Sequence, residues 1–225
     1  MVMDLLQAIK ERHSVRSYAD KPIGEDVKGR LQAVIDACNA ESGLNMQLVT
    51  GEPRAFGSWL AHYGTFSAVS NYIVVAGAKG VDEKCGYYGE KVVLEAQMLG
   101  LNTCWVGLTY KKVKGSFVLR DGEKVHLVIA LGYGTTQGVV HKIKRFEDVA
   151  SAEDGRAEFP GWFKDGVGAA LLAPTAVNQQ KFHFTLCLDG KVKADTRWGF
   201  FSRVDLGIAK LHFEIGSGRG NDVWQ

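Results

Sequence analysis

The stretch Ala173-Pro174-Thr175-Ala176-Val177-Asn178-Gln179-Gln180 has a weaker copy earlier in the chain, Ala40-Glu41-Ser42-Gly43-Leu44-Asn45-Met46-Gln47. The two asparagines, Asn45 and Asn178, lie 133 positions apart (178 − 45), and Gln47 and Gln180 keep this spacing. A helical pattern precedes each copy, and a strand-like run follows it. Repeated units of this kind predict two related halves within one chain, which would form an internal pseudo-dimer.

A second echo joins two helical segments at an offset of 116 (216 − 100): Val93, Ala96 and Gly100 correspond to Ala209, His212 and Gly216. In contrast, the charged cluster Arg12-His13-Ser14-Val15-Arg16 has no counterpart in the second half. This asymmetry predicts one functional site and not two. The Asn45 copy would then belong to a second site that stays empty.

The composition is that of an ordinary globular protein. The chain has 225 residues, 46% of them hydrophobic, and 4 prolines, which allows a substantial core in one large domain or two small ones. A net charge of +2 gives no reason to expect a nucleic-acid or membrane partner. The 4 cysteines are scattered without a Cys-x-x-Cys pair, so no metal site is expected. With no signal peptide and no apolar run of about 20 residues, the sequence predicts a soluble, cytoplasmic protein.

Hydrophobic spacing predicts helices over 25–37, 86–99, 162–172 and 205–215, and strands over 46–49, 71–76, 125–131 and 181–188. The predicted fold class is α+β, with three layers in which helices pack on a mixed or mostly antiparallel sheet. Between Phe146 and Phe159 the sequence becomes polar, and we interpret this stretch as a linker. Residues 1–150 would form the first half, and residues 151–225 a second, shorter half that completes the same compact unit.

The cluster after the first helix has a spacing that suits an anion. Arg12, Ser14 and Arg16 fall at i, i+2 and i+4, so an extended segment would let two guanidinium groups and one hydroxyl converge. Arginine suits phosphate because its planar fork donates two hydrogen bonds at once. A solvated basic turn gives the same short pattern, and the motif alone does not decide between the two.

The stretch 173–180 also carries groups that suit a ligand. Pro174 ends a helix, and Thr175 can form local hydrogen bonds. Asn178 and Gln180 place amides before a strand, and amides that donate and accept suit a heteroaromatic ring with carbonyl and imino edges. Taken alone, the segment could equally be a loop that stops a helix.

Four motifs in order resemble the nitroreductase family of FMN-dependent oxidoreductases. They are residues 12–18 with Lys21-Pro22-Ile23, residues 99–107 (similar to the family's G-L-G-T-C-W-x-G), residues 130–134 with the basic stretch 142–145, and residues 173–180 (similar to A-P-S-x-x-N-x-Q). Members of the family build the FMN site across a homodimer. Here the better copy of the last motif lies in the second half, and Glu41 stands at the proline position of the first. The chain therefore resembles a fused, internally duplicated branch in which one chain supplies both sides of the flavin pocket.

The resemblance implies a role for each matching residue. Arg12, Ser14 and Arg16, in the cluster that includes His13, would hold the FMN phosphate and ribityl chain, with added positive charge from Lys142 and Lys144. The backbone around Trp105, Val106 and Gly107 would face the N5 and O4 edge of the flavin. Pro174, Thr175, Ala176, Asn178 and Gln180 would approach the ring from the other half. No catalytic side chain is expected, since the flavin carries the redox chemistry.

The implied function is the transfer of hydride from NADH or NADPH, through FMN, to a small electron-poor acceptor of the nitroaromatic or quinone type. A flavin-binding sensor or storage module without turnover remains an alternative, as does a degenerate relative without cofactor. The duplication predicts a monomer or a weak homodimer. Six aromatic residues could roof a substrate pocket or belong to the core: Trp59, Tyr63, Phe66, Trp198, Phe200 and Phe201.

Overall fold

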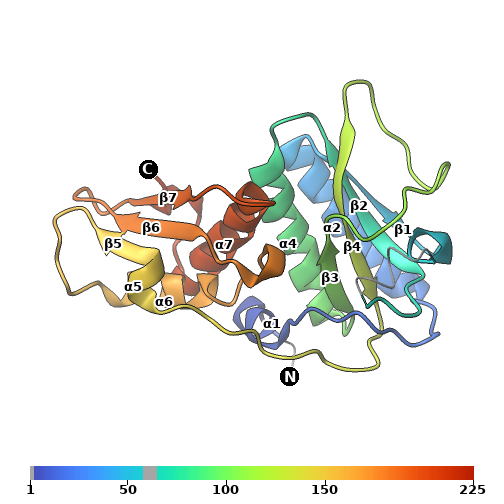
Figure 1. The fold of residues 1–225 in the computed structure, drawn as a ribbon, viewed down its shortest axis with the longest axis horizontal. Helices are drawn as coiled ribbons and strands as arrows, with labels where there is room; N and C mark the ends of the chain where they lie inside the picture. Colours follow the sequence, from blue (N-terminus) through green and yellow to red (C-terminus); the bar gives the residue numbers. More distant parts are fainter. Residues whose placement is uncertain (1–2, 58–64) are drawn as a thin grey trace.

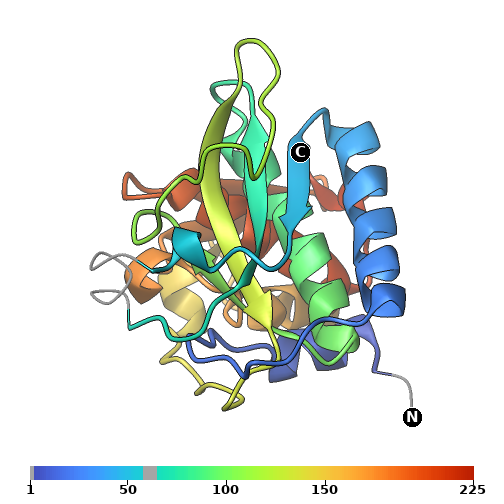
Figure 2. The same cartoon turned by 90° about the vertical axis from the view of Figure 1, so that its right-hand side faces the viewer.

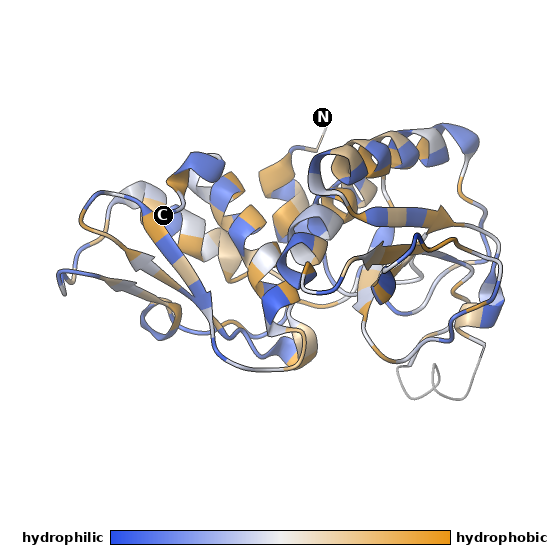
Figure 3. Ribbon diagram, turned by 90° about the horizontal axis from the view of Figure 1, so that it is seen from above, coloured by the Kyte–Doolittle hydropathy of each residue, from blue (hydrophilic) through white to orange (hydrophobic). Residues whose placement is uncertain are grey.

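Two β-sheets lie at opposite ends of the molecule, with helices between them, in a computed structural model that describes residues 3–57 and 65–225 (Figure 1, Figure 3). The first sheet has the order β1-β2-β4-β3 and is antiparallel throughout: β1 (Asn45–Val49), β2 (Asn71–Gly77), β4 (Lys124–Gly132) and β3 (Asn102–Val106). The second has the order β5-β6-β7: β5 (Ala150–Ala152), β6 (Phe182–Leu186) and β7 (Val192–Thr196). Since β5 is parallel to β6 and β7 antiparallel to it, this sheet is mixed. The predicted α+β class is confirmed.

The helices follow the apolar spacing of the sequence. They are α1 (Leu5–Glu11), α2 (Glu25–Ser42), α4 (Asp82–Met98), α5 (Phe146–Val149), α6 (Gly161–Ala170) and α7 (Ser202–Ser217), with short 3-10 turns η1 (Pro53–Ala55), η2 (Ala176–Asn178) and η3 (Asn221–Val223). Helix α2 ends at Gly43, whose φ of 77° lets its N–H close the last turn on the Asn39 carbonyl. In Figure 2 the first sheet stands in front of the second half, with α2 along one side.

Helices α4 and α7 cross at the middle of the molecule, where glycine lets two backbones touch (Figure 1). A Cβ added to Gly86 would lie 2.0 Å from the Val204 carbonyl oxygen, and one added to Gly207 would lie 2.0 Å from the Glu83 carbonyl oxygen. The two contacts are reciprocal at an offset of 121 (207 − 86 and 204 − 83). The offset of 116 read from the sequence is therefore wrong for this crossing, because small residues recur every three or four positions on packed helices and several registers match.

The chain passes from the first sheet to the second through residues 133–145, which run along the lower edge of Figure 1. The stretch 146–159 that we interpreted as a linker begins with α5 and β5, and β5 pairs with β6 through Ala150 opposite Phe184. The interpretation was wrong for this part because elements of three or four residues show no periodicity. Strand β7 also escaped the sequence analysis, because it is short and only one of its five residues, Val192, is a buried hydrophobic residue.

No helix among the described residues is long and apolar enough to cross a membrane.

The crossing predicts opposite effects for two glycine-to-alanine changes. Gly86→Ala would press a methyl group into the backbone of α7 and should lower the free energy of unfolding by about 1–3 kcal/mol or more. Gly29→Ala, on the exposed side of α2 with no atom within 4 Å of the new Cβ, should raise it by about 0.5–1 kcal/mol. Urea unfolding followed by circular dichroism measures both. Equal effects of the two changes would contradict the close crossing.

Candidate functional site

A cleft opens between the two halves, bounded by residues 12–16, the end of β3, the loop 174–178 and the first turns of α7. Its two ends join through a shared set of lining residues: Ser14, Arg16, Pro174, Thr175 and Val177. The end that we call the apolar end is also lined by Trp105, Val106, Gly107, Leu127, Ala176, Phe201, Val204, Asp205 and Ile208. The end that we call the basic end is also lined by Arg12, His13, Val139, His141 and Asn178.

The segment 12–16 presents its polar side chains to the cleft because it is extended. The Val15 N–H donates to the Thr103 carbonyl at 3.0 Å, which fixes the segment beside β3. Val15 is buried on the opposite side, where the Tyr18 hydroxyl donates to its carbonyl at 2.7 Å. Side chains alternate along extended backbone, so Arg12, Ser14 and Arg16 share the side that faces the cleft.

Arg12 is a buried cation beside the cleft. Its side chain is 2% exposed, and its nearest acidic neighbour is Glu90, with 3.6 Å between Nε and Oε1. Within the described part of the chain, Nε makes no hydrogen bond. Burial lowers the pKa of Arg12, and the charge of Glu90 opposes that effect. A buried guanidinium that lines a cleft, with one acidic neighbour and a described Nε that makes no hydrogen bond, is suited to binding an anion.

The second basic contribution comes from a residue that the sequence analysis did not single out. His141 lines the basic end, and its Nε2 lies 3.0 Å from the Leu171 carbonyl. The pKa of His13 is lowered by burial first, and then by the charges of Arg12 and His141. Lys142 and Lys144 do not line the cleft; the Lys144 ammonium donates to the Gln180 carbonyl at 2.6 Å.

Instead of charge, the Lys142–Lys144 stretch supplies backbone groups that hold the loop. Asn178 Nδ2 and Gln180 Nε2 both donate to the Lys142 carbonyl at 2.8 Å, and the Lys144 N–H donates to Gln180 Oε1 at 2.9 Å. Gln180 Nε2 also donates to Asn178 Oδ1 at 2.8 Å. Gln180 is therefore a buried anchor of the loop and does not line the cleft.

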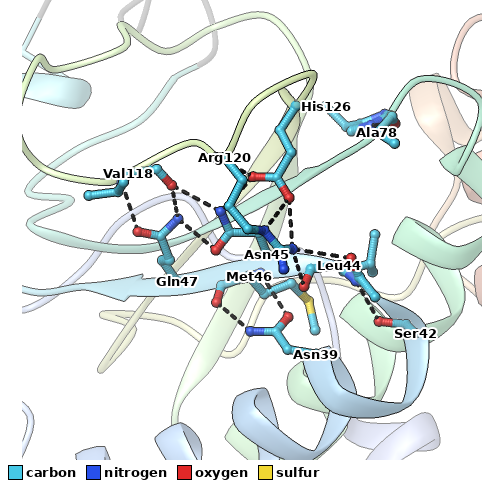
Figure 4. Close-up of polar contacts among 12 residues, drawn as sticks. Asn39, Ser42, Leu44, Asn45, Met46, Gln47, Ala78, Val118, Arg120 and His126 are labelled. Atoms are coloured by element: carbon cyan, nitrogen blue, oxygen red, sulfur yellow. Dashed lines mark hydrogen bonds and ion pairs between the residues drawn. The ribbon is translucent and has the colours of Figure 1, made fainter.

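The earlier copy makes the same pattern of hydrogen bonds (Figure 4). Asn45 Nδ2 and Gln47 Nε2 donate to the Val118 carbonyl at 3.0 and 2.6 Å, and Gln47 Nε2 donates to Asn45 Oδ1 at 3.1 Å. The Val118 N–H donates to Gln47 Oε1 at 2.9 Å. The similarity between 40–47 and 173–180 thus extends from sequence to contacts.

The loop at the cleft is strained. Val177, Asn178 and Gln180 have φ of 47°, 55° and 43°, and Phe201 on the facing segment has φ of 55°. For a β-branched residue such as Val177 this conformation is costly, and it persists only where other contacts impose it. Asp205 on α7 is one of those contacts, since its carboxylate accepts from the Ala176 N–H at 3.0 Å and from Gln179 Nε2 at 2.6 Å.

The apolar end has a flat aromatic wall. The Phe201 ring lies against Gly107, where an added Cβ would come within 2.4 Å of it. Trp105 is fixed by a hydrogen bond from Nε1 to Glu90 Oε2 at 2.9 Å. Val204 and Ile208 on α7 complete the apolar part of the lining.

The structure brings eleven of the fourteen residues singled out from the sequence into this cleft: Arg12, His13, Ser14, Arg16, Trp105, Val106, Gly107, Pro174, Thr175, Ala176 and Asn178. Of the six aromatic candidates, Phe201 lines the cleft, Trp198 and Phe200 are exposed, and Phe66 is buried against Phe56. Trp59 and Tyr63 lie outside the described residues. In residues 3–57 and 65–225, no group of three or more His, Cys, Asp or Glu side chains could hold a metal ion.

Asp205 predicts a measurable pH dependence. Burial raises its pKa from 3.8 to about 6, so its contribution to stability is fully present below the unfolded pKa and is lost as the pH rises through about 6. Between about pH 4 and pH 7 this group should lower the free energy of unfolding by about 3 kcal/mol. Asp205→Asn can keep the hydrogen bond from the Ala176 N–H and should remove the pH-dependent component, although its amide can pair with Gln179 only if the Gln179 amide flips and gives up its bond to the Phe200 carbonyl. Identical pH profiles of the apoproteins would contradict the assignment.

Comparisons with known proteins identify a family and several similar folds. Residues 4–217 match the model of a family described as "Putative TM nitroreductase". A crystal structure described as a "putative nitroreductase" from Thermotoga maritima is 22% identical, covers 98% of this chain and 88% of its own, and has a TM-score of 0.69. The search of curated proteins found no match.

Two other solved structures share part of the fold. One, described as a "putative nitroreductase in complex with fmn" from Desulfovibrio desulfuricans, is 17% identical over 66% of this chain and 95% of its own, with a TM-score of 0.50. Another, described as "Putative NADH dehydrogenase/NAD(P)H nitroreductase" from Parabacteroides distasonis, is 20% identical over 64% and 95%, with a TM-score of 0.51. Because the family model spans nearly the whole chain, the protein belongs to this nitroreductase family.

Proposed function

We propose that the chain binds one FMN in the cleft and passes hydride from NADH or NADPH to a small electron-poor acceptor of the nitroaromatic or quinone type. The observation that carries this proposal is the buried guanidinium of Arg12, which lines the basic end and whose Nε makes no hydrogen bond to a described residue. The phosphate of FMN would supply the anion that this group lacks. The FMN named in the description of the Desulfovibrio structure supports the same cofactor.

The basic end of the cleft would bind the phosphate side of the cofactor, and the apolar end would contact its ring. Arg12, Ser14 and Arg16 would bind the phosphate and the ribityl chain. At the other end, the backbone of Val106 and Gly107 would border the N5 and O4 edge of the ring, and Phe201 would pack on it. When bound, FMN supplies the hydride-transfer chemistry. The apolar side chains Val204, Ile208 and Phe201 would limit the access of water to the space in which donor and acceptor would take turns.

We also propose that the two halves form an internal pseudo-dimer with a single cofactor site. The matching hydrogen bonds of Asn45–Gln47 and Asn178–Gln180 support it, as does the reciprocal contact of Gly86 and Gly207.

A second cavity lies near Glu41, the residue at the position of Pro174, and is lined by carboxylates and aromatics: Glu41, Glu83, Lys84, Tyr87, Tyr88, Lys210, Glu214, Asn221 and Trp224. Its lining includes no arginine and three carboxylates, one of which, Glu83, pairs with Lys210, so the cavity suits a phosphate poorly. We expect this enzyme to work in the cytoplasm as a monomer or a weak homodimer.

The proposal predicts a yellow protein that can be bleached. Purified protein, reconstituted with FMN and freed of excess, should show flavin absorption at about one FMN per chain, and anaerobic NADH or NADPH should remove the oxidised flavin bands. Bands that persist with both nucleotides would favour a flavin-binding module without turnover. A chain that takes up no FMN would contradict the proposal.

Arg16→Ala gives the matching binding test. Loss of one charged phosphate contact, worth about 1.5–3 kcal/mol, should weaken FMN retention roughly 10- to 150-fold. Arg30→Ala is the control, because Arg30 is an exposed residue of α2 that pairs with Glu95 away from the cleft. Equal retention by the two variants would remove Arg16 from the site.

A further inference from the structure

A buried network of charged and polar side chains lies directly behind the cleft, where four secondary-structure elements meet. Glu90 on α4 and His212 on α7 are both 0% exposed, and 3.0 Å separates His212 Nε2 from Glu90 Oε1. The same carboxylate accepts from Trp105 Nε1 on β3 at 2.9 Å and faces Arg12 Nε, just past α1, at 3.6 Å. Neither Glu90 nor His212 lines the cleft, but Trp105 and Arg12 do.

The chemistry of the contacts fixes the number of protons in this network. His212 Nδ1 lies 3.2 Å from the Ala169 carbonyl, which can only accept, so Nδ1 carries a proton. Nε2 faces a carboxylate oxygen, and a hydrogen bond there requires one further proton between the two groups. Together, Glu90 and His212 are then neutral in total charge, whichever of them holds that proton.

We propose that Glu90 and His212 are positioning residues for the cofactor site: His212 holds the Glu90 carboxylate, which in turn orients Arg12 toward the phosphate and Trp105 toward the ring. This inference rests on the proposed FMN site. Arg12 has no other acidic partner in the described part of the chain, so Glu90 is the group that can set the direction of its guanidinium. Because the carboxylate is buried, its orientation is fixed by its partners and not by solvent. Glu90 and His212, one from each half of the chain, would therefore shape the phosphate site without touching the ligand.

Glu90→Gln tests the role selectively. A glutamine with Nε2 at the Oε1 position can donate to His212 Nε2, once that nitrogen has lost its proton, and its Oε1 can still accept from Trp105. Since the substitution removes one negative charge and releases one proton, the net charge behind the cleft is unchanged. The substitution removes the ion pair between residue 90 and Arg12, because the Arg12 Nε–H then faces the glutamine Nε2, which is also a donor.

Fluorescence titration of the full-length apoprotein with FMN and with riboflavin, which lacks the phosphate, measures the effect. Glu90→Gln should weaken FMN binding roughly 10- to 100-fold, the range known for supporting partners in metal sites, and leave riboflavin binding unchanged. The ¹⁵N signal of His212 Nε2 should move from a protonated to an unprotonated position. Glu95→Gln, five positions along α4 and paired with Arg30 at the surface, should change neither.

Each other outcome counts against the inference. Equal weakening of FMN and riboflavin would show a merely structural role, and unchanged FMN binding would show that Arg12 needs no support from Glu90. If Glu90→Gln does not accumulate in folded form, Glu90→Asp keeps the charge but withdraws the carboxylate from both Arg12 and Trp105, and FMN binding should weaken more than riboflavin binding. A wild-type chain that binds neither flavin would instead overturn the proposed function, and this inference with it.

Discussion

The close crossing of α4 and α7 is the constraint on which the other features of this protein depend. At Gly86 and Gly207 the two helices meet backbone to backbone, with no room for even a methyl group. This contact sets how near the second half lies to the first, and so how near the start of α7 lies to residues 12–16 and β3. The cleft exists because these segments face each other across that fixed distance. The buried Glu90–His212 pair, which joins the same two helices, adds a polar contact that works only at this spacing.

The loop 174–180 shows how a strained segment is kept in place at the cleft. Its left-handed residues would relax in isolation, but the Gln180 amide is held by Lys142 and Lys144, and the Ala176 N–H by Asp205. In the first half, the side-chain amides of Asn45 and Gln47 bond in a similar way to the Val118 backbone, without the arginine cluster beside them (Figure 4). The two segments share these contacts, but Arg12 and Arg16 line the cleft beside residues 174–178, whereas the lining of the cavity near Glu41 includes no arginine.

Much of the fold and of the candidate site could be predicted from the sequence. Long periodic segments such as α2 and β4 appeared where the spacing predicted them. The Arg12 cluster and the 173–180 motif reached the cleft because alternation in extended backbone and helix-stopping turns are local properties. The residues that were missed depend on tertiary contacts: His141 reaches the basic end only through the path of the 133–145 segment, and Asp205 only through the crossing of α7. Lys142 and Lys144, which the family resemblance suggested as a source of positive charge, hold the loop mainly through backbone groups.

The most direct test of this account is a crystal structure of the full chain grown with FMN. The account predicts one flavin per chain, its phosphate hydrogen-bonded to the guanidinium of Arg12 and its ring between Gly107 and the loop 174–178. A flavin seated in the cavity near Glu41, or one whose phosphate leaves Arg12 without a partner, would contradict it.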